Sequence, residues 1–123
     1  MYKRQVKRPY EVDVWVQIPG GFLRSRKDLW IECKDRRESI KRRDIADLIN
    51  KAKDVYQAVE AGREEFYCDE LLFVSTSSFD SDALALADYQ GVACLFYDGK
   101  RFLLENKWKW GEHKWLRDVK ATT

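Results

Sequence analysis

The chain has 123 residues, of which 45% are hydrophobic and 36% charged, so we expect one domain with a single core. These fractions exclude a disordered tail, a collagen-like repeat and a miniprotein held together by disulfides. The longest uninterrupted apolar run is six residues, Val92 to Tyr97, too short to cross a bilayer or to form the core of a signal peptide. The sequence therefore predicts a soluble, cytoplasmic protein with no membrane partner.

Positive charge is concentrated in the first third of the chain. Residues 1–43 contain 13 Lys and Arg against 6 Asp and Glu, whereas residues 44–123 contain 10 against 15. Charged side chains most often only solvate a surface, but a basic half combined with acids also fits a polyanion binder with a metal site. No long basic helix with a bulky apolar face is evident, which favours nucleic acid over a membrane surface.

The chain has an odd number of cysteines, Cys33, Cys68 and Cys94, and none of them forms a C-x-x-C pair. Because their neighbours are apolar or strand-like, we expect small buried hydrophobic side chains in a reducing cytosol. The only histidine, His113, lies far along the chain from all three. A zinc site with four such ligands is therefore not expected.

Two strands are expected in the first part of the chain. From Tyr10 to Ile18 every second residue is apolar, which predicts a strand with Asp13 on its polar face. Leu29 to Lys34 also alternates, so that Glu32 and Lys34 share one face with a tryptophan. The simplest arrangement is an antiparallel hairpin with a long loop.

Helices and strands alternate after a charged connection at residues 35–43. Apolar residues three and four apart predict a helix from about Ile45 to Gly62. The remaining predicted elements follow in chain order: a strand at Leu71–Val74, a helix from about Asp80 to Tyr89 capped by Ser78 or Asp80, a strand at Val92–Tyr97, a tight turn at Asp98–Gly99 and a strand at Phe102–Leu104.

This order predicts an α/β fold, a mixed sheet flanked by helices. The single domain spans residues 1–123, with a basic N-terminal segment at 1–9 and a Trp-rich tail at 105–123. Trp108 and Trp110 alternate with lysines as in an edge strand. We favour packing or a dimer seam for them over stacking on bases.

Glu32-x-Lys34 is the candidate for chemistry. An acid two residues before a lysine occurs five times in the chain, so the context selects this pair and not the spacing alone. Carboxylates of Asp13 and Glu32, from adjacent strands, would bind Mg²⁺ or Mn²⁺, with the main-chain carbonyl of Cys33 as a further ligand. Such an ion bridges a scissile phosphate and activates water, which Lys34 would orient or deprotonate. The alternative is an ion pair between Glu32 and Lys34 on a solvated strand face.

The segment Glu11–Asp13, followed after a long hairpin by Trp30–Lys34, resembles the PD-(D/E)xK nuclease superfamily. The later segment Phe73–Phe79, its Ala-rich continuation and Val92–Gly99 are similar to Mrr-type restriction endonucleases, which carry a strand, a Thr/Ser-rich turn, an Ala-rich helix and a strand ending in Asp-Gly. The resemblance covers about Tyr10 to Gly99 and implies a restriction-endonuclease-like fold. Archaeal Holliday-junction resolvases share this core.

By this resemblance Asp13 and Glu32 are the metal ligands and Lys34 is the catalytic lysine. The family core opens with a helix and a strand that often supplies another acid, but only nine residues precede Tyr10 and the N-terminal core helix has no counterpart. Glu11 is an alternative source of that acid. We therefore expect a fragment, a reduced domain or completion by another chain, and the family is commonly a homodimer because two DNA strands need two sites.

A run of basic residues follows the proposed site directly. As phosphate contacts, these residues would position a duplex without reading its sequence, although a solvated helix entrance is an equal alternative: Arg36, Arg37, Lys41, Arg42 and Arg43. The hydroxyls of Ser75 to Ser78 fit a phosphate or ordinary helix capping. The sequence thus predicts a divalent-metal-dependent DNA endonuclease. The alternative is a non-cleaving nucleic-acid-binding or assembly module with the same fold.

Overall fold

Six strands form one sheet in the computed structural model, which describes residues 2–4, 14–18, 27–62 and 68–109. Their order across the sheet is their order in the chain: β1 (Tyr2–Arg4), β2 (Val14–Ile18), β3 (Lys27–Lys34), β4 (Glu70–Ser75), β5 (Val92–Tyr97) and β6 (Phe102–Leu104). Two helices connect the central strands: α1 (Arg42–Glu60) between β3 and β4, and α2 (Ser81–Gln90) between β4 and β5.

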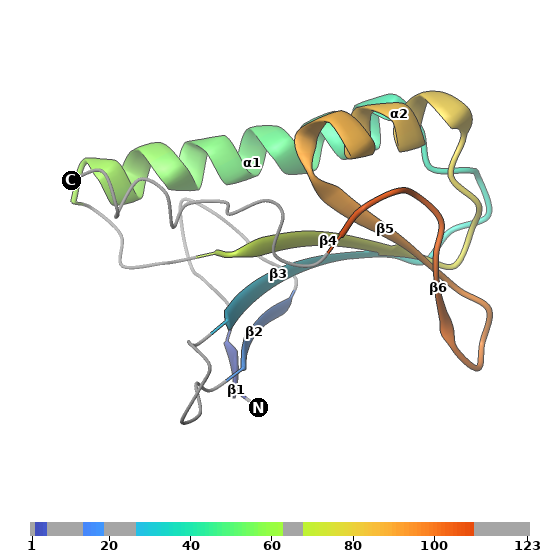
Figure 1. Cartoon of the computed structure of the whole chain (residues 1–123), viewed down its shortest axis with the longest axis horizontal. Coiled ribbons are helices and arrows are strands. Elements are labelled where there is room, and N and C mark those ends of the chain that lie inside the picture. Colours follow the sequence, from blue (N-terminus) through green and yellow to red (C-terminus); the bar gives the residue numbers. More distant parts are fainter. Residues whose placement is uncertain (1, 5–13, 19–26, 63–67, 110–123) are drawn as a thin grey trace.

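The sheet is mixed, as predicted. β1, β2 and β3 pair antiparallel, β3, β4 and β5 pair parallel, and β6 returns antiparallel to β5. Because both parallel crossovers step in the same direction and share one handedness, their helices lie on the same face of the sheet. Figure 1 shows α1 and α2 side by side over that face. The α/β fold with its mixed sheet is confirmed.

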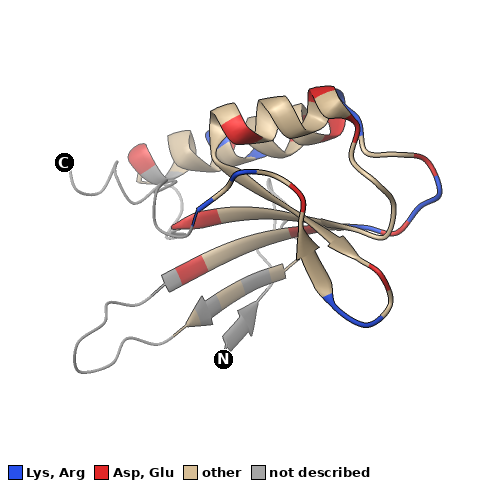
Figure 2. Ribbon diagram, turned by 45° about the vertical axis from the view of Figure 1, so that its right-hand side comes forward, with Lys and Arg blue, Asp and Glu red and all other residues tan. Residues whose placement is uncertain are grey.

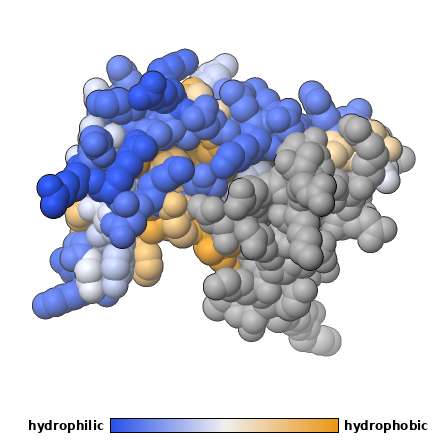
Figure 3. All heavy atoms as spheres, turned by 180° about the vertical axis from the view of Figure 1, so that it is seen from behind, coloured by the Kyte–Doolittle hydropathy of each residue, from blue (hydrophilic) through white to orange (hydrophobic). Residues whose placement is uncertain are grey.

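Alternation along the strands gives the sheet two different faces. Trp30, Phe73 and Cys94 point toward the helices and join the larger core cluster with the apolar stripe of α1. Leu29, Leu72 and other residues of opposite parity form a second cluster on the other face. The solvent side of the helical layer is hydrophilic (Figure 3).

Capping residues mark both ends of α2. The N-cap of α2 is Asp80, one of the two residues predicted for this position. Its carboxylate accepts a hydrogen bond from the Ala83 N–H at 2.8 Å. The small side chains of Ala83 and Ala87 are fully buried, which allows close packing of α2 on the sheet. Gly91 ends the helix with φ +78°, a conformation that favours glycine.

Several predictions for the described residues need correction. β1 was not expected, since three residues carry no alternating pattern and the strand forms by pairing with β2. α1 begins at Arg42, so the charged connection is shorter than expected. Residues 107–109 are not an edge strand. The packing role favoured for Trp108 is the one that the structure shows, against the second cluster. Trp110 lies outside the described residues.

The cysteine prediction is correct for two of three thiols. Cys68 and Cys94 are buried, and burial raises the pKa of both, to about 12 for Cys94. Cys33 is exposed, because it lies at the outer end of β3 on the face opposite α1. It is therefore wrong to treat Cys33 as a buried hydrophobic side chain.

Candidate functional site

The acidic side chain of Glu32 on β3 is buried beneath α1 and does not lie on a solvated face. Trp30 and Glu32 share the helix-facing side of the strand, and they are 0% and 4% exposed. A carboxylate this buried needs cationic or hydrogen-bonding partners, because its desolvation is otherwise costly. The Glu32–Lys34 ion pair of the alternative interpretation is present, at 3.9 Å, but the Glu32 carboxylate is buried and does not lie on a solvated face.

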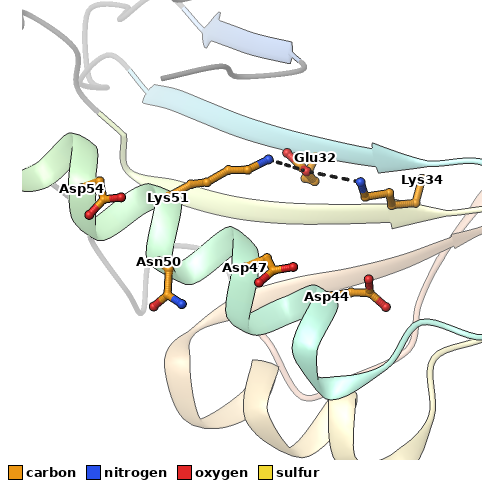
Figure 4. Close-up of a pocket in the computed structure, with 7 residues that line it drawn as sticks. All are labelled: Glu32, Lys34, Asp44, Asp47, Asn50, Lys51 and Asp54. Atoms are coloured by element: carbon orange, nitrogen blue, oxygen red, sulfur yellow. Dashed lines mark hydrogen bonds and ion pairs between the residues drawn. The ribbon is translucent and has the colours of Figure 1, made fainter. Parts of the chain in front are cut away.

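Two lysines from different elements meet the carboxylate of Glu32. The ammonium of Lys51, on α1, donates a hydrogen bond to Glu32 Oε2 at 3.2 Å, and that of Lys34 lies 3.9 Å from the same oxygen. Figure 4 shows the two side chains approaching the carboxylate from opposite directions. The lysine side chains are 44% and 41% exposed, against 5% for that of Glu32. A buried anion thus has two partly solvated cations at its outer edge.

A hollow of about 290 Å³ opens beside this contact, between β3 and α1. Its lining from the helix is a polar stripe at spacings of three and four residues, seen as sticks in Figure 4: Asp44, Asp47, Asn50, Lys51 and Asp54. Its lining from the strand is Glu32 and Lys34. Carboxylate and amide oxygens are the donors that Mg²⁺ and Mn²⁺ take, so the donor set fits such an ion in kind.

The ligand set is only partly within the described residues. Asp13 lies outside them, and Val14, which follows it in the sequence, pairs with Ile31, the residue before Glu32. Among residues 2–4, 14–18, 27–62 and 68–109, no three His, Cys, Asp or Glu side chains come together as a metal-binding group. Glu32 is therefore the one predicted carboxylate ligand whose surroundings are visible. The carbonyl of Cys33 stays a predicted ligand.

Asp44 lines the hollow but also holds the start of α1. Its Oδ2 accepts the Lys41 backbone N–H at 2.8 Å, and it forms an ion pair with the Arg36 guanidinium. Burial acts to raise the pKa of the Asp44 carboxyl, but the hydrogen bonds from Lys41 and Arg36 more than offset this and leave the pKa below its ordinary value of 3.8. Asp44 is therefore a capping carboxylate that is charged at neutral pH.

The predicted phosphate contacts divide into two kinds. Arg36 is half-buried and bound to Asp44, so it has a structural role at the entrance to the helix. The other four side chains are exposed: Arg37, Lys41, Arg42 and Arg43. Figure 2 shows this basic stretch along the connection from β3 to α1. Their exposure suits contacts with phosphates and equally suits a solvated surface.

A second, wider hollow of about 650 Å³ lies where the parallel strands end. It is lined by the residues that follow β3 and β4 and by one aromatic ring of β5: Asp35, Arg36, Arg37, Thr76, Ser77, Ser78 and Phe96. The Thr76 hydroxyl donates to Asp35 at 2.8 Å, and the Ser77 N–H donates to Ser75 Oγ at 2.9 Å. These hydroxyls therefore order the turn, while the N-cap of α2 is Asp80 and not Ser78.

Sequence reasoning did not identify Lys51 or the acidic residues of α1. Asp44, Asp47, Lys51 and Asp54 follow the helical repeat and lie beside the apolar positions that were used to predict the helix. The signal that could have identified them was a polar stripe next to the buried stripe, on a helix that crosses over the candidate strand.

No protein-family model, curated protein or solved structure matches this chain. Within the ranges the structure describes, none of the helices combines the length and the apolar character needed to span a membrane. The function must therefore be argued from the site itself.

Proposed function

We propose that this chain is a divalent-metal-dependent DNA endonuclease of the PD-(D/E)xK type, which hydrolyses phosphodiester bonds. The observation that carries the proposal is the position of Glu32: a buried carboxylate, beside Lys34 on one strand face, at the edge of a hollow with oxygen donors. A buried charge at the edge of a polar hollow is costly for a merely structural strand, and it suits a cation site.

Asp13 and Glu32 would hold Mg²⁺ or Mn²⁺, with the Cys33 carbonyl as a further ligand. The ion supplies Lewis-acid activation of the phosphate and of a bound water. Lys34, two residues after Glu32 and on the same face, would orient the attacking water and offset negative charge on the phosphate. Burial of Glu32 under α1 keeps its carboxylate in place while the more exposed lysine ends can move.

The DNA backbone would lie across the end of β3 that carries Lys34. Arg37 and the exposed basic residues at the start of α1 are on the connection that leaves this strand end, and the wider hollow with Arg37 adjoins it. Contacts of this kind position a duplex and do not select its sequence. Cutting both strands would require a homodimer or a second chain, so we propose that a single subunit nicks DNA.

Cleavage of supercoiled plasmid in Mg²⁺ or Mn²⁺, with EDTA as the blank, tests the proposal. We expect Glu32→Gln and Lys34→Ala to lower the rate by roughly 1,000-fold or more, since each removes a group that acts on the reacting phosphate. Glu38→Gln and Lys53→Ala remove the same charges at exposed positions outside the hollow and should cleave like the parent protein. Undiminished cleavage by Glu32→Gln or Lys34→Ala would contradict the mechanism.

A second candidate is a nucleic-acid-binding module that does not cleave. It is favoured by one observation, that the Glu32 carboxylate has two ammonium groups beside it and so has its charge balanced without a metal ion. This candidate predicts DNA binding that weakens steeply with salt and no metal-dependent cleavage by the parent protein. The plasmid assay, paired with a binding titration at several salt concentrations, separates the two.

A further inference from the structure

Lys51 is the closer of the two lysines to the Glu32 carboxylate, at 3.2 Å against 3.9 Å for Lys34. It belongs to α1 and lies 17 positions after Lys34 in the sequence. Asp47 lies four residues before Lys51 and Asp54 three residues after it, so both carboxylates flank it on the same helix face and line the same hollow. Lys51 therefore has three acidic neighbours, of which Glu32 is its hydrogen-bond partner.

An ammonium group and a divalent cation cannot share one carboxylate oxygen at low cost. A metal ion would lie about 2.1 Å from a ligand oxygen. The ammonium of Lys51 is already at hydrogen-bond distance from Glu32 Oε2, and both residues line the hollow. Two cations this close repel each other strongly in a partly desolvated site. Metal binding to this carboxylate thus requires that Lys51 leave or that the two cations be held apart.

The Lys51 side chain can move its ammonium away from the Glu32 carboxylate. It is 44% exposed, it has a flexible stem of four methylenes, and Asp47 and Asp54 offer alternative carboxylates within one helical turn. Lys34 also lines the hollow, but its ammonium is farther from Glu32 Oε2, at 3.9 Å, and is therefore the weaker competitor for that oxygen.

We propose that Lys51 is an internal competitor of the divalent cation: its ammonium neutralises Glu32 in the metal-free protein and is displaced when the ion binds. This inference rests on the metal site of the proposed function and adds a residue that sets the affinity of that site. It assigns Lys51 a role in setting the metal affinity and not a catalytic role. The consequence is a site that is stable without metal and binds metal more weakly than its carboxylates alone would.

Titration calorimetry with Mn²⁺ tests the inference without any cleavage assay. Lys51→Gln keeps a hydrogen-bond donor for Glu32 and removes the charge, so we expect the Kd for Mn²⁺ to fall about tenfold. Lys51→Arg retains the charge and should keep the affinity of the parent protein. Lys53→Gln makes the same change at an exposed position of the same helix and should shift the Kd less than about twofold. Circular dichroism checks that each variant is folded.

The outcomes separate the two proposals. Tighter Mn²⁺ binding by Lys51→Gln alone supports competition, including the case in which only this variant binds measurably. An unchanged or weaker affinity of Lys51→Gln, with Mn²⁺ still bound by the parent protein, overturns the role of Lys51 and leaves the metal site intact. An absence of Mn²⁺ binding in every variant overturns both the metal site and the inference.

Discussion

The two ends of β3 both carry buried carboxylates, but they are held in different ways. At the amino end, Asp28 and Asp69 are 0% and 2% exposed, and the Asp28 N–H donates to Asp69 Oδ2 at 2.7 Å. The Asp69 N–H in turn donates to the Asp28 carbonyl at 2.8 Å, which joins β3 to the start of β4. Toward the carboxyl end, Glu32 meets flexible ammonium groups and faces a hollow.

Burial of an acid is therefore not by itself a sign of function in this chain. A backbone N–H is fixed by the sheet, so the carboxylate of Asp69 is committed to the link between two strands. A lysine ammonium can move away and leave the carboxylate for another cation. The nature of the partner, and the open space beside it, distinguish Glu32 from Asp69. Substitutions at the two ends should accordingly affect different properties.

The largest effect on stability is expected at the amino end. Asp69→Ala leaves the buried Asp28 N–H without its side-chain acceptor and should lower the free energy of unfolding by about 1–3 kcal/mol. The folded fraction should cleave plasmid at the parent rate, because Asp69 lies outside the hollow. Urea denaturation measures the loss, with Glu38→Ala as an exposed control. A stable Asp69→Ala variant with reduced cleavage would reverse the assignment of the two ends.

A smaller effect is expected for Asp44, which lines the hollow but serves the helix. Its pKa is lower in the folded protein than the ordinary 3.8, so its contribution is present above that pH and is lost as the pH falls through the folded pKa. Asp44→Asn should cost about 1 kcal/mol at neutral pH, and this difference should shrink progressively below pH 4. Urea denaturation over that pH range measures it, with Asp47→Asn as a control. A cost independent of pH would show that the charge of Asp44 is not involved.

The smallest effect concerns the outer end of β3, where Cys33 is exposed. Burial raises the pKa of Cys68 and Cys94, so little thiolate forms at either in the folded protein. Ellman's reagent at mild alkaline pH should therefore modify one thiol quickly, and all three only after denaturation. Cys33→Ser should remove the fast reaction and change the stability by less than about 0.5 kcal/mol. A fast reaction that persists in Cys33→Ser would place another thiol at the surface.

Much of the fold could be predicted because its central elements carry regular patterns. β5 and β6 have the predicted bounds, and α2 starts after Asp80, one of its two predicted caps. Apolar runs, the Asp98–Gly99 turn and a capping side chain are all local signals. β1 could not be predicted, because a three-residue strand is specified by its partner and not by its own sequence. The position of Trp108 against the second cluster could not be predicted either, because it too depends on a packing partner elsewhere in the chain.

The candidate site was predicted only on the strand side. Alternation places Glu32 and Lys34 on one face of β3, and the structure confirms that face. The alternation in the sequence could not show that α1 covers this face, because the placement of the helix depends on the handedness and direction of the crossover. Lys51 is close to Glu32 only through that packing, which connects residues 19 apart in the chain. Asp13, by contrast, stays a prediction.

The most direct test is the position of a bound ion. A crystal of the protein grown or soaked in Mn²⁺ and measured for anomalous scattering should show a peak within about 2.5 Å of a Glu32 carboxylate oxygen, with Asp13 as a second ligand and the Lys51 ammonium moved away. A Mn²⁺ peak bound elsewhere, with Glu32 still held by Lys51, would contradict the account.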